Sequence, residues 1–286
     1  MDRLTSILLF AGLGCFALAF VLSAWYPYVI TDGKVPMATI AELAEDVSVQ
    51  FKQLKSAYPV SFSEFPGAAG TRSDDELRHA DETARSASDA AWSEAYAHAL
   101  RRGRDRYIGE ACWHCHSQFV RPAANEVQRY GPVQTAAHDN NALQRPVLWG
   151  TRRVGPDLTH EGGKRSNDWH VAHFKDPTST SPDSVMPTYP WLFRDGFQVV
   201  RTIDPDKATR NGLSTSTTYK LPGLHADEAG AKTALDALKA ALDPQLQDEA
   251  ERMSIEAADG PNAEALALIA YLQWLGTWDP ASKGAN

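Results

Sequence analysis

The longest apolar stretch of the chain lies at its N-terminus. No charged residue occurs from Leu4 to Ile30, and this run is longer than the roughly 20 residues with which a helix crosses the hydrocarbon core of a bilayer. Several aromatic residues gather near its far end, where their rings favour the headgroup layer. The pattern predicts a single transmembrane anchor over residues 1–30. The charge of Arg3 favours an N-terminus on the inner side and an exported body.

Two other interpretations of this apolar run are weaker. A cleaved signal peptide would use the small pair Ala17 and Ala19, but the apolar sequence continues well past them, which a signal peptide does not need. A lipoprotein would use Cys15, but Gly12 and Leu13 poorly match the residues that usually precede a lipidated cysteine. We therefore interpret Cys15 as a small residue that is compatible with lipid.

Helical patterns recur along the rest of the chain. Residues 38–56 predict an amphipathic helix, because Thr39 and Glu42 match a capping box and apolar residues recur on one face. Further helices are predicted over residues 73–102, 230–242 and 262–275. Residues 59–70 are interpreted as a linker and residues 196–223 as a loop. No strand pattern of convincing length is found, so the sequence predicts an all-α fold with loop-rich insertions.

The composition narrows the classes of partner. The chain has 36 acidic and 28 basic residues, a formal net charge of −8. With no basic stripe it lacks the charge that neutralises phosphates, so no nucleic acid is expected as a partner. Three cysteines in 286 residues are too few for a disulfide framework.

Two of these cysteines belong to a motif that carries chemistry. Cys112-Trp113-His114-Cys115-His116 has the C-x-x-C-H pattern of covalent haem attachment. Two thiols add to the two vinyl groups of one haem, and the following residue, His116, becomes an axial ligand of the iron. A zinc half-site would need a second Cys pair, and a dithiol redox pair would need a βαβ context, neither of which the sequence offers. His114 is interpreted as a surface or interface residue. The prediction is one covalently attached haem c.

The second axial ligand is predicted from a proline-rich loop. Met186 lies in Ser184-Val185-Met186-Pro187-Thr188-Tyr189-Pro190-Trp191-Leu192, whose prolines hold the backbone stiffly. A thioether ligand also raises the potential of a cytochrome c haem. Met37 follows the anchor, Met253 lies in a charged helical context, and Met1 is on the inner side. Competing ligands are His160, His170 and His173, although such residues more often pack or cap.

Two further features fit a haem pocket. The turn Gly155-Pro156-Asp157-Leu158 offers a carbonyl that can accept the proton of the His116 ring and fix its orientation. Arginines are concentrated around the motif, and some are expected to pair with the haem propionates. They are Arg121, Arg129, Arg152, Arg153 and Arg165, with Arg152 and Arg153 as the main candidates.

Three blocks resemble a known family. They are GRDRYIGEACWHCHSQFVRPAANEVQRYGP, WGTRRVGPDLTHEGGKRSNDWHVAHFKDP and MPTYPWLF, all within residues 103–193. Their order and spacing resemble the mono-haem subunit II of cbb3-type (C-type) haem-copper oxidases, as do the anchor and the closing ALIAYLQWLGT. The resemblance implies one haem c, ligated by the residues that are His116 and Met186 here.

The resemblance also implies partners and a location. A subunit of this kind sits in the bacterial inner membrane, with a single span and its C-terminal domain in the periplasm. It would receive electrons from a di-haem cytochrome c subunit or a soluble cytochrome c, and pass them to the catalytic haem-copper subunit. It is thus expected to be a non-catalytic electron-transfer subunit, without catalytic residues of its own.

Parts of the chain depart from the family pattern. Residues 31–99 exceed the usual connection between anchor and motif, and residues 196–260 are only loosely similar. We therefore predict an extra, partly helical connecting segment over 31–102 and a cytochrome c domain over 103–286, and hypothesise that the extra segment docks a partner. A subunit of a related reductase, such as a nitric oxide reductase, is the main alternative, and a peroxidase-like enzyme or a zinc-binding scaffold is less favoured.

Overall fold

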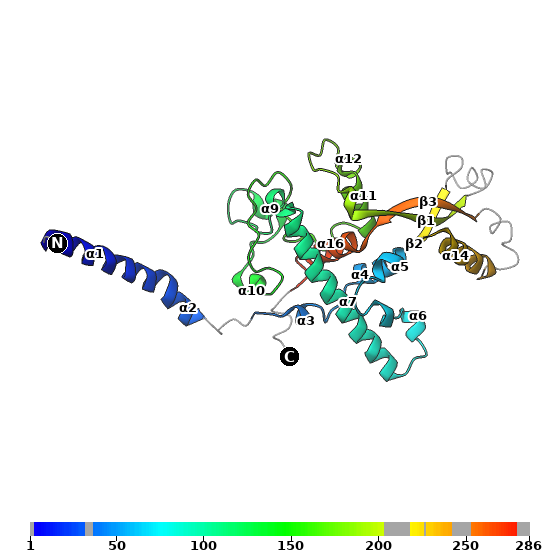
Figure 1. Ribbon diagram of the computed structural model, residues 1–286, viewed down its shortest axis with the longest axis horizontal. Coiled ribbons are helices and arrows are strands. Elements are labelled where there is room, and N and C mark those ends of the chain that lie inside the picture. The colour runs from blue at the N-terminus through cyan, green and yellow to red at the C-terminus, as the bar shows by residue number, and fades with distance from the viewer. Residues whose placement is uncertain (1–2, 32–36, 203–217, 226, 242–252, 279–286) are drawn as a thin grey trace.

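The chain is mostly helical, with one small sheet at one end (Figure 1). A computed structural model describes residues 3–31, 37–202, 218–225, 227–241 and 253–278. The prediction of a mostly helical chain with one N-terminal apolar helix is confirmed.

The N-terminal helix stands apart from the rest of the molecule (Figure 1). It comprises α1 (Arg3–Phe20), a π-helical turn η1 (Val21–Trp25) and α2 (Tyr26–Thr31). The stretch Arg3–Ile30 is long and apolar enough to cross a membrane, and none of it is buried against the protein. An apolar surface left uncovered by its own chain needs another apolar environment, and a bilayer supplies it.

The segment after the anchor forms several short helices. The capping box of Thr39 and Glu42 begins α3 (Ile40–Leu43), as predicted. The single helix expected over residues 38–56 is wrong, because the chain leaves α3 and starts again at α4 (Val49–Ala57), where the Ser48 side chain accepts the N–H of Phe51. Part of the expected linker is also helical, as α5 (Pro59–Phe62) and η2 (Ala68–Gly70).

Two helices that are far apart in sequence pack against each other at the centre of the fold. After the short α6 (Asp74–Leu77), α7 runs over Glu82–Gly109, and α16 (Ala263–Trp274) crosses it near Gly103. A Cβ on Gly103 would lie 2.1 Å from the carbonyl oxygen of Ala267. Glycine therefore permits the close approach of the two backbones. The helix predicted over 262–275 is confirmed by α16. The helix predicted over 73–102 is divided into α6 and α7, and α7 continues past residue 102.

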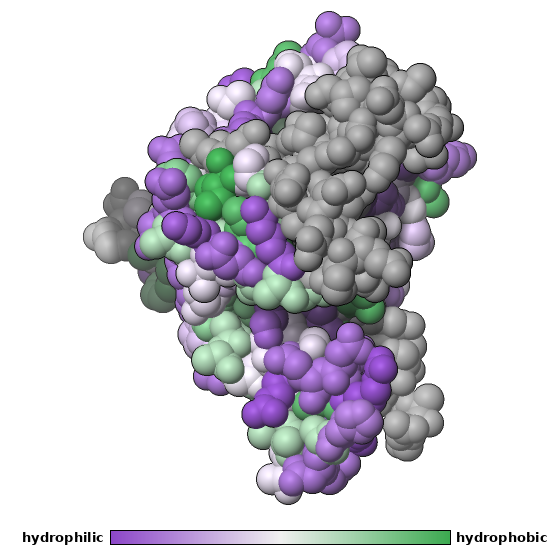
Figure 2. Space-filling model, turned by 90° about the vertical axis from the view of Figure 1, so that its right-hand side faces the viewer, coloured by the Kyte–Doolittle hydropathy of each residue, from purple (hydrophilic) through white to green (hydrophobic). Residues whose placement is uncertain are grey.

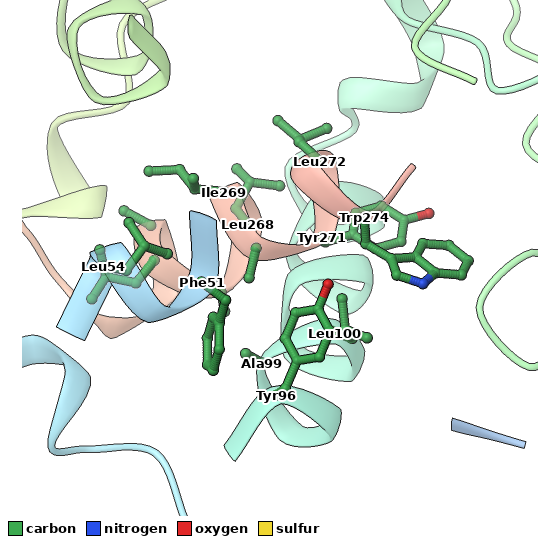
Figure 3. Packing of buried hydrophobic residues seen from close by; sticks show 14 of the residues in the cluster. Phe51, Leu54, Tyr96, Ala99, Leu100, Leu268, Ile269, Tyr271, Leu272 and Trp274 are labelled. Atoms are coloured by element: carbon green, nitrogen blue, oxygen red, sulfur yellow. The ribbon is translucent and has the colours of Figure 1, made fainter. Parts of the chain in front are cut away.

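The core lies where α4, α5, α7 and α16 meet, and Figure 3 shows the part formed by α4, α7 and α16. Phe51 of α4 is completely buried, with its ring 5.1 Å from that of Phe62 and 4.9 Å from that of Tyr96. Leu54, also fully buried, packs in the same core as Leu268 of α16. Full burial of such side chains contributes roughly 1.5–3 kcal/mol each. The apolar face of residues 38–56 is thus occupied within the chain.

A three-stranded antiparallel sheet corrects the sequence prediction. It consists of β1 (Phe193–Thr202), β2 (Thr218–His225) and β3 (Met253–Pro261) in the order β2-β1-β3. The expectations of no strands, of a loop throughout 196–223 and of a helical context for Met253 are therefore wrong. Pairing of Phe193 with Pro261 joins segments far apart in sequence, which a local pattern does not reveal.

One helix packs on this sheet and completes the end of the molecule. It is α14 (Glu228–Ala241), close to the helix predicted over 230–242. Val199, Leu235 and Met253 form a small buried cluster between the helix and the sheet. Figure 2 looks onto this end, where the described residues in view are mostly hydrophilic, with small, separate apolar patches.

Short helices and loops make up the sequence between α7 and β1. They are α8 (Cys112–Cys115), α9 (Glu126–Tyr130), α10 (Ala136–Asp139), α11 (Asn167–Lys175), α12 (Pro177–Thr180) and η3 (Pro190–Leu192). This region begins where α7 ends and returns to β1. It carries the predicted site residues.

Candidate functional site

A cavity of about 900 Å³ opens beside the C-terminal end of α7. Its walls come from α8, the turn at residues 154–158, α11, the loop before Tyr189, and α16. The structure places Cys112, Cys115, His116 and Met186 around this one cavity. Its size lies within the range of about 300–1,000 Å³ of small-molecule and cofactor sites.

The two thiols are presented on a single helical turn. Ala111 takes a left-handed conformation with φ of 58° between α7 and α8, which turns the chain into the motif. The N–H of His116 donates to the carbonyl of Cys112 (2.9 Å) and closes the turn. Burial, reinforced by the charge of Glu110, raises the pKa of the Cys112 thiol to about 12. The thiol is therefore neutral at physiological pH, unlike the low-pKa cysteines of redox pairs and metal sites.

The ring of His116 is oriented by a backbone carbonyl. Its Nδ1 lies 3.0 Å from the carbonyl oxygen of Pro156. A carbonyl only accepts hydrogen bonds, so Nδ1 carries the proton. Burial lowers the pKa of His116, and the ring is neutral at physiological pH. In a neutral ring with a protonated Nδ1, Nε2 carries the lone pair, which is the state that ligates a metal.

The turn that supplies this carbonyl packs closely against the His116 ring. A Cβ on Gly155 would lie 2.2 Å from Cε1 of His116, so no other residue type fits there without displacing the ring. The N–H of Gly155 donates to the carbonyl of Cys115 (3.1 Å). On the other side, the buried hydroxyl of Tyr107 donates to the carbonyl of His116. The histidine is thus held through both its ring and its backbone.

Met186 lines the same cavity from a loop between α12 and η3. It is half-buried and packs against the main core, and its N–H donates to the hydroxyl oxygen of Ser184 (3.2 Å). Met253, by contrast, lies in β3, and Met37 is 56% exposed outside the cavity. Met1 lies outside the described residues. Among the described methionines, Met186 is the one that lines the cavity.

The predicted arginines divide into two groups. Arg152 lines the cavity, together with Arg129 and Arg165. Arg153 and Arg121 are directed elsewhere, since both bind the carboxylate of Glu126. Hydrogen bonds from Arg121 and then Arg153 hold the pKa of Glu126 at about 2. Of the two main candidates, the structure places Arg152 on the cavity wall and Arg153 behind it.

Two of the three competing histidines also line the cavity. Burial lowers the pKa of His170 and that of His173 to about 4. Nδ1 of His173 lies 2.6 Å from the hydroxyl of Thr180, and its ring stacks on Trp169. His160 is held at the carbonyl of Pro132 (2.9 Å) and lies outside the cavity lining.

Several lining residues were not singled out from the sequence. Tyr189 is buried and faces the Cys112 sulfur, with which it shares a hydrogen bond. Lys164 adds a cation to the wall, and Glu110 lies at the end of α7. Tyr189 lies three residues after Met186, so the proline-rich loop could have indicated it. No sequence pattern indicated Lys164 or Glu110, because a single charged residue occurs in many structural contexts.

The residues present fit one haem. Cys112 and Cys115 face one cavity from a single helical turn, which suits two thioether bonds to one haem, and the His116 Nε2 lone pair and Met186 thioether offer nitrogen and sulfur ligands. Arg129, Arg152, Lys164 and Arg165 offer cations for the two propionates. Over the described part of the chain, no group of three or more His, Cys, Asp or Glu side chains is arranged to hold a metal ion by itself.

Comparison with protein families gives a match over most of the chain. The family described as cytochrome C oxidase, mono-heme subunit/FixO matches residues 83–278, well over half of the chain. No curated protein matches it significantly.

Proposed function

From membership of the family of mono-haem cytochrome c oxidase subunits (FixO), to which this chain belongs, we propose that it carries electrons between a cytochrome donor and the catalytic haem-copper subunit. The family assigns one haem and a place in a multi-subunit oxidase with a catalytic partner. The observation that carries the proposal is the convergence of Cys112, Cys115, His116 and Met186 on one cavity.

The proposal assigns a role to each of these residues. Cys112 and Cys115 would hold the haem through thioether bonds, and His116 Nε2 and the Met186 sulfur would ligate its iron. Arg152 binds a propionate. When bound, the haem supplies an iron that accepts and releases one electron. Two strong protein ligands leave the iron no open position for a substrate, which favours electron transfer over peroxidase chemistry.

The surrounding residues keep the site rigid. The carbonyl of Pro156 fixes the His116 ring, and the hydroxyl of Tyr107 fixes its backbone. The buried rings of Tyr189 and Phe174 exclude water from the inner wall. A site that moves little between two oxidation states has a small reorganisation cost, which suits fast electron transfer.

The anchor supports a location for this reaction. The Arg3–Ile30 helix is able to cross a membrane, and we place the chain in the bacterial inner membrane with the haem domain in the periplasm. The donor is a di-haem cytochrome c subunit of the complex or a soluble cytochrome c. Oxygen reduction takes place in the catalytic partner.

The first test is the intact mass of the denatured full-length chain purified from membranes. We expect one haem above the polypeptide mass, because thioether bonds survive denaturation. Cys112→Ala and Cys115→Ala should each prevent stable double attachment. Cys15→Ala is the matched control, since Cys15 lies in the exposed anchor, and it should retain the haem. A bare polypeptide mass in the wild-type chain would refute the proposal.

The role of Met186 is tested separately. Met186→Ala should keep the covalent haem, open the iron to small ligands such as CO and lower the midpoint potential, because a thioether ligand raises it. Met37→Ala, which alters an exposed methionine outside the cavity, should change neither. An unchanged potential in Met186→Ala would remove Met186 from the ligand set.

A further inference from the structure

Asp157 places a buried carboxylate directly behind the haem-binding motif. Its side chain is 1% exposed. Oδ2 accepts from the hydroxyl of Ser117 (2.6 Å) and from the N–H of Phe119 (2.9 Å), and Oδ1 accepts from the N–H of Thr159 (2.9 Å). The guanidinium of Arg153 lies 3.9 Å from Oδ2. Burying a charge is costly unless it is paired and hydrogen-bonded, and this carboxylate meets that condition on both oxygens.

These bonds join two pieces of chain that matter to the iron ligand. Ser117 and Phe119 follow His116 directly, and Asp157 follows Pro156, whose carbonyl orients the His116 ring. The N–H of Leu158 also donates to the carbonyl of Ser117 (2.9 Å). The side chain of Asp157 therefore fastens the 155–159 turn onto the segment that carries His116.

The arrangement requires a carboxylate rather than an amide. Both Phe119 and Thr159 present backbone N–H groups, one to each oxygen of Asp157. An asparagine has one acceptor oxygen, so its NH₂ group would face one of these two donors. One buried N–H would then lose its partner, at a cost of roughly 1–3 kcal/mol.

We propose that Asp157 is a positioning residue, which holds the Pro156 carbonyl against His116 Nδ1 and thereby sets the electron-donating strength of the ligand. This inference rests on the proposed haem function. A hydrogen bond to the free nitrogen of a ligating imidazole makes the ligand more basic, and such outer contacts tune the metal. The negative charge of Asp157 acts in the same direction, because it stabilises the more positive ferric state. Loss of either effect favours the ferrous state.

The test measures the midpoint potential of the haem in the full-length chain purified from membranes in detergent. Asp157→Asn should retain the covalent haem and raise the midpoint potential. NMR of the same protein should show faster solvent exchange of the His116 Nδ1 proton. Asp139→Asn is the matched control, because it neutralises another buried carboxylate that lies outside the cavity lining. It should leave both measurements unchanged.

A second variant tests the role of Asp157 in case the Asp157→Asn protein does not fold. Ser117→Ala keeps the carboxylate and its two backbone donors but removes one hydrogen bond, and it should shift the potential upward by less than Asp157→Asn. An unchanged potential in a haem-loaded Asp157→Asn protein would overturn the positioning role alone, as would an unchanged potential in Ser117→Ala if Asp157→Asn does not accumulate. An equal shift in Asp139→Asn would also overturn it. A wild-type chain without haem would overturn the proposed function and this role together.

Discussion

The helical core and the cavity region are held together in different ways. In the core, apolar side chains from α4, α5, α7 and α16 bury one another. Phe51 is completely buried and has Tyr96 among its aromatic neighbours (Figure 3). Around the cavity, backbone and side-chain hydrogen bonds fix short loops, as at His116 and Asp157. Helix α7 belongs to both, with Tyr96 in the core and Tyr107 beside the motif.

The core and the cavity region contribute differently to stability and to function. Apolar burial is non-directional and scales with area, so it stabilises the chain without fixing a particular atom. Hydrogen bonds contribute little net free energy but are directional, so they set the orientation of a ligand. The core therefore carries most of the free energy of folding, and the cavity region carries the geometry on which electron transfer depends.

The largest effect on stability is expected from a large-to-small substitution in the core. Phe51→Ala should lower the free energy of unfolding by about 3–5 kcal/mol, because it removes buried contacts and leaves a cavity among aromatic rings. Denaturant unfolding of the detergent-purified chain measures the loss. Val49→Ala, on the 65% exposed neighbour, should change it by less than about 0.5 kcal/mol. A small effect of Phe51→Ala would mean that the core is not the main source of stability.

The cavity wall contains buried titratable groups, so the free energy of unfolding should depend on pH. The unfolded chain protonates His170 below about pH 6.5, whereas burial holds the folded pKa at about 4. The unfolded state therefore binds more protons between these values, and stability falls as the pH drops through this window, by about 3 kcal/mol for this residue. His170→Gln should lose the share of this fall that His170 contributes, whereas His173, whose pKa burial also lowers to about 4, keeps its own share. The same change at the exposed His79 should retain the whole fall, and identical pH profiles for wild type and His170→Gln would contradict the prediction.

The crossing of α7 and α16 tests whether the two regions respond together. Gly103→Ala places a Cβ 2.1 Å from the carbonyl oxygen of Ala267 and should cost about 1–3 kcal/mol through overpacking. Gly109→Ala is the control in the same helix, since its Cβ would meet nothing within 4 Å. It should stabilise by roughly 0.5–1 kcal/mol. Thermal unfolding monitored separately by far-UV circular dichroism and haem absorbance should shift together for Gly103→Ala, and separate shifts would refute a shared crossing.

The smallest effect on stability is expected at the cavity rim. Arg152→Gln should change the free energy of unfolding by less than about 0.5 kcal/mol yet lower the midpoint potential, because it removes a cation near the haem. Arg121→Gln is the control, since that guanidinium already binds Glu126 outside the cavity. Redox titration distinguishes the two. Equal potentials in both variants would show that Arg152 does not sense the haem charge.

The core and the motif were predictable because their signals are local. The capping box at Thr39 and the apolar face of the last helix depend on residues within a few positions of one another. The spacing from Cys112 to His116 likewise lies within one helical turn. Short-range patterns of this kind predict structure whenever tertiary contacts agree with them.

The sheet and the inner contacts of the site depend on distant residues. Phe193 pairs with Pro261, and Asp157 binds Ser117 across forty positions. The strand β1 contains charged residues and Gly196, which weakens its own propensity. Nothing near Asp157 in the sequence indicates which backbone donors it will meet, so the pattern pointed to the Pro156 carbonyl but not to the carboxylate beside it.

The partnership of α7 with α16 has a consequence for how the chain comes to fold. The two helices contact closely, yet Gly103 and Ala267 are separated by most of the domain. Contacts between residues so far apart in sequence form slowly. The chain loses entropy as the long loop between them closes, and the free energy of the contact offsets this loss only afterwards. Helices α4 and α5 are made before α7 and supply Phe51 and Phe62 to its aromatic face, whereas the stretch of α7 around Gly103 is covered only once α16 has been made. Helix α16 therefore closes the core last, and a chain truncated before residue 263 would lack the side chains that α16 packs against α7.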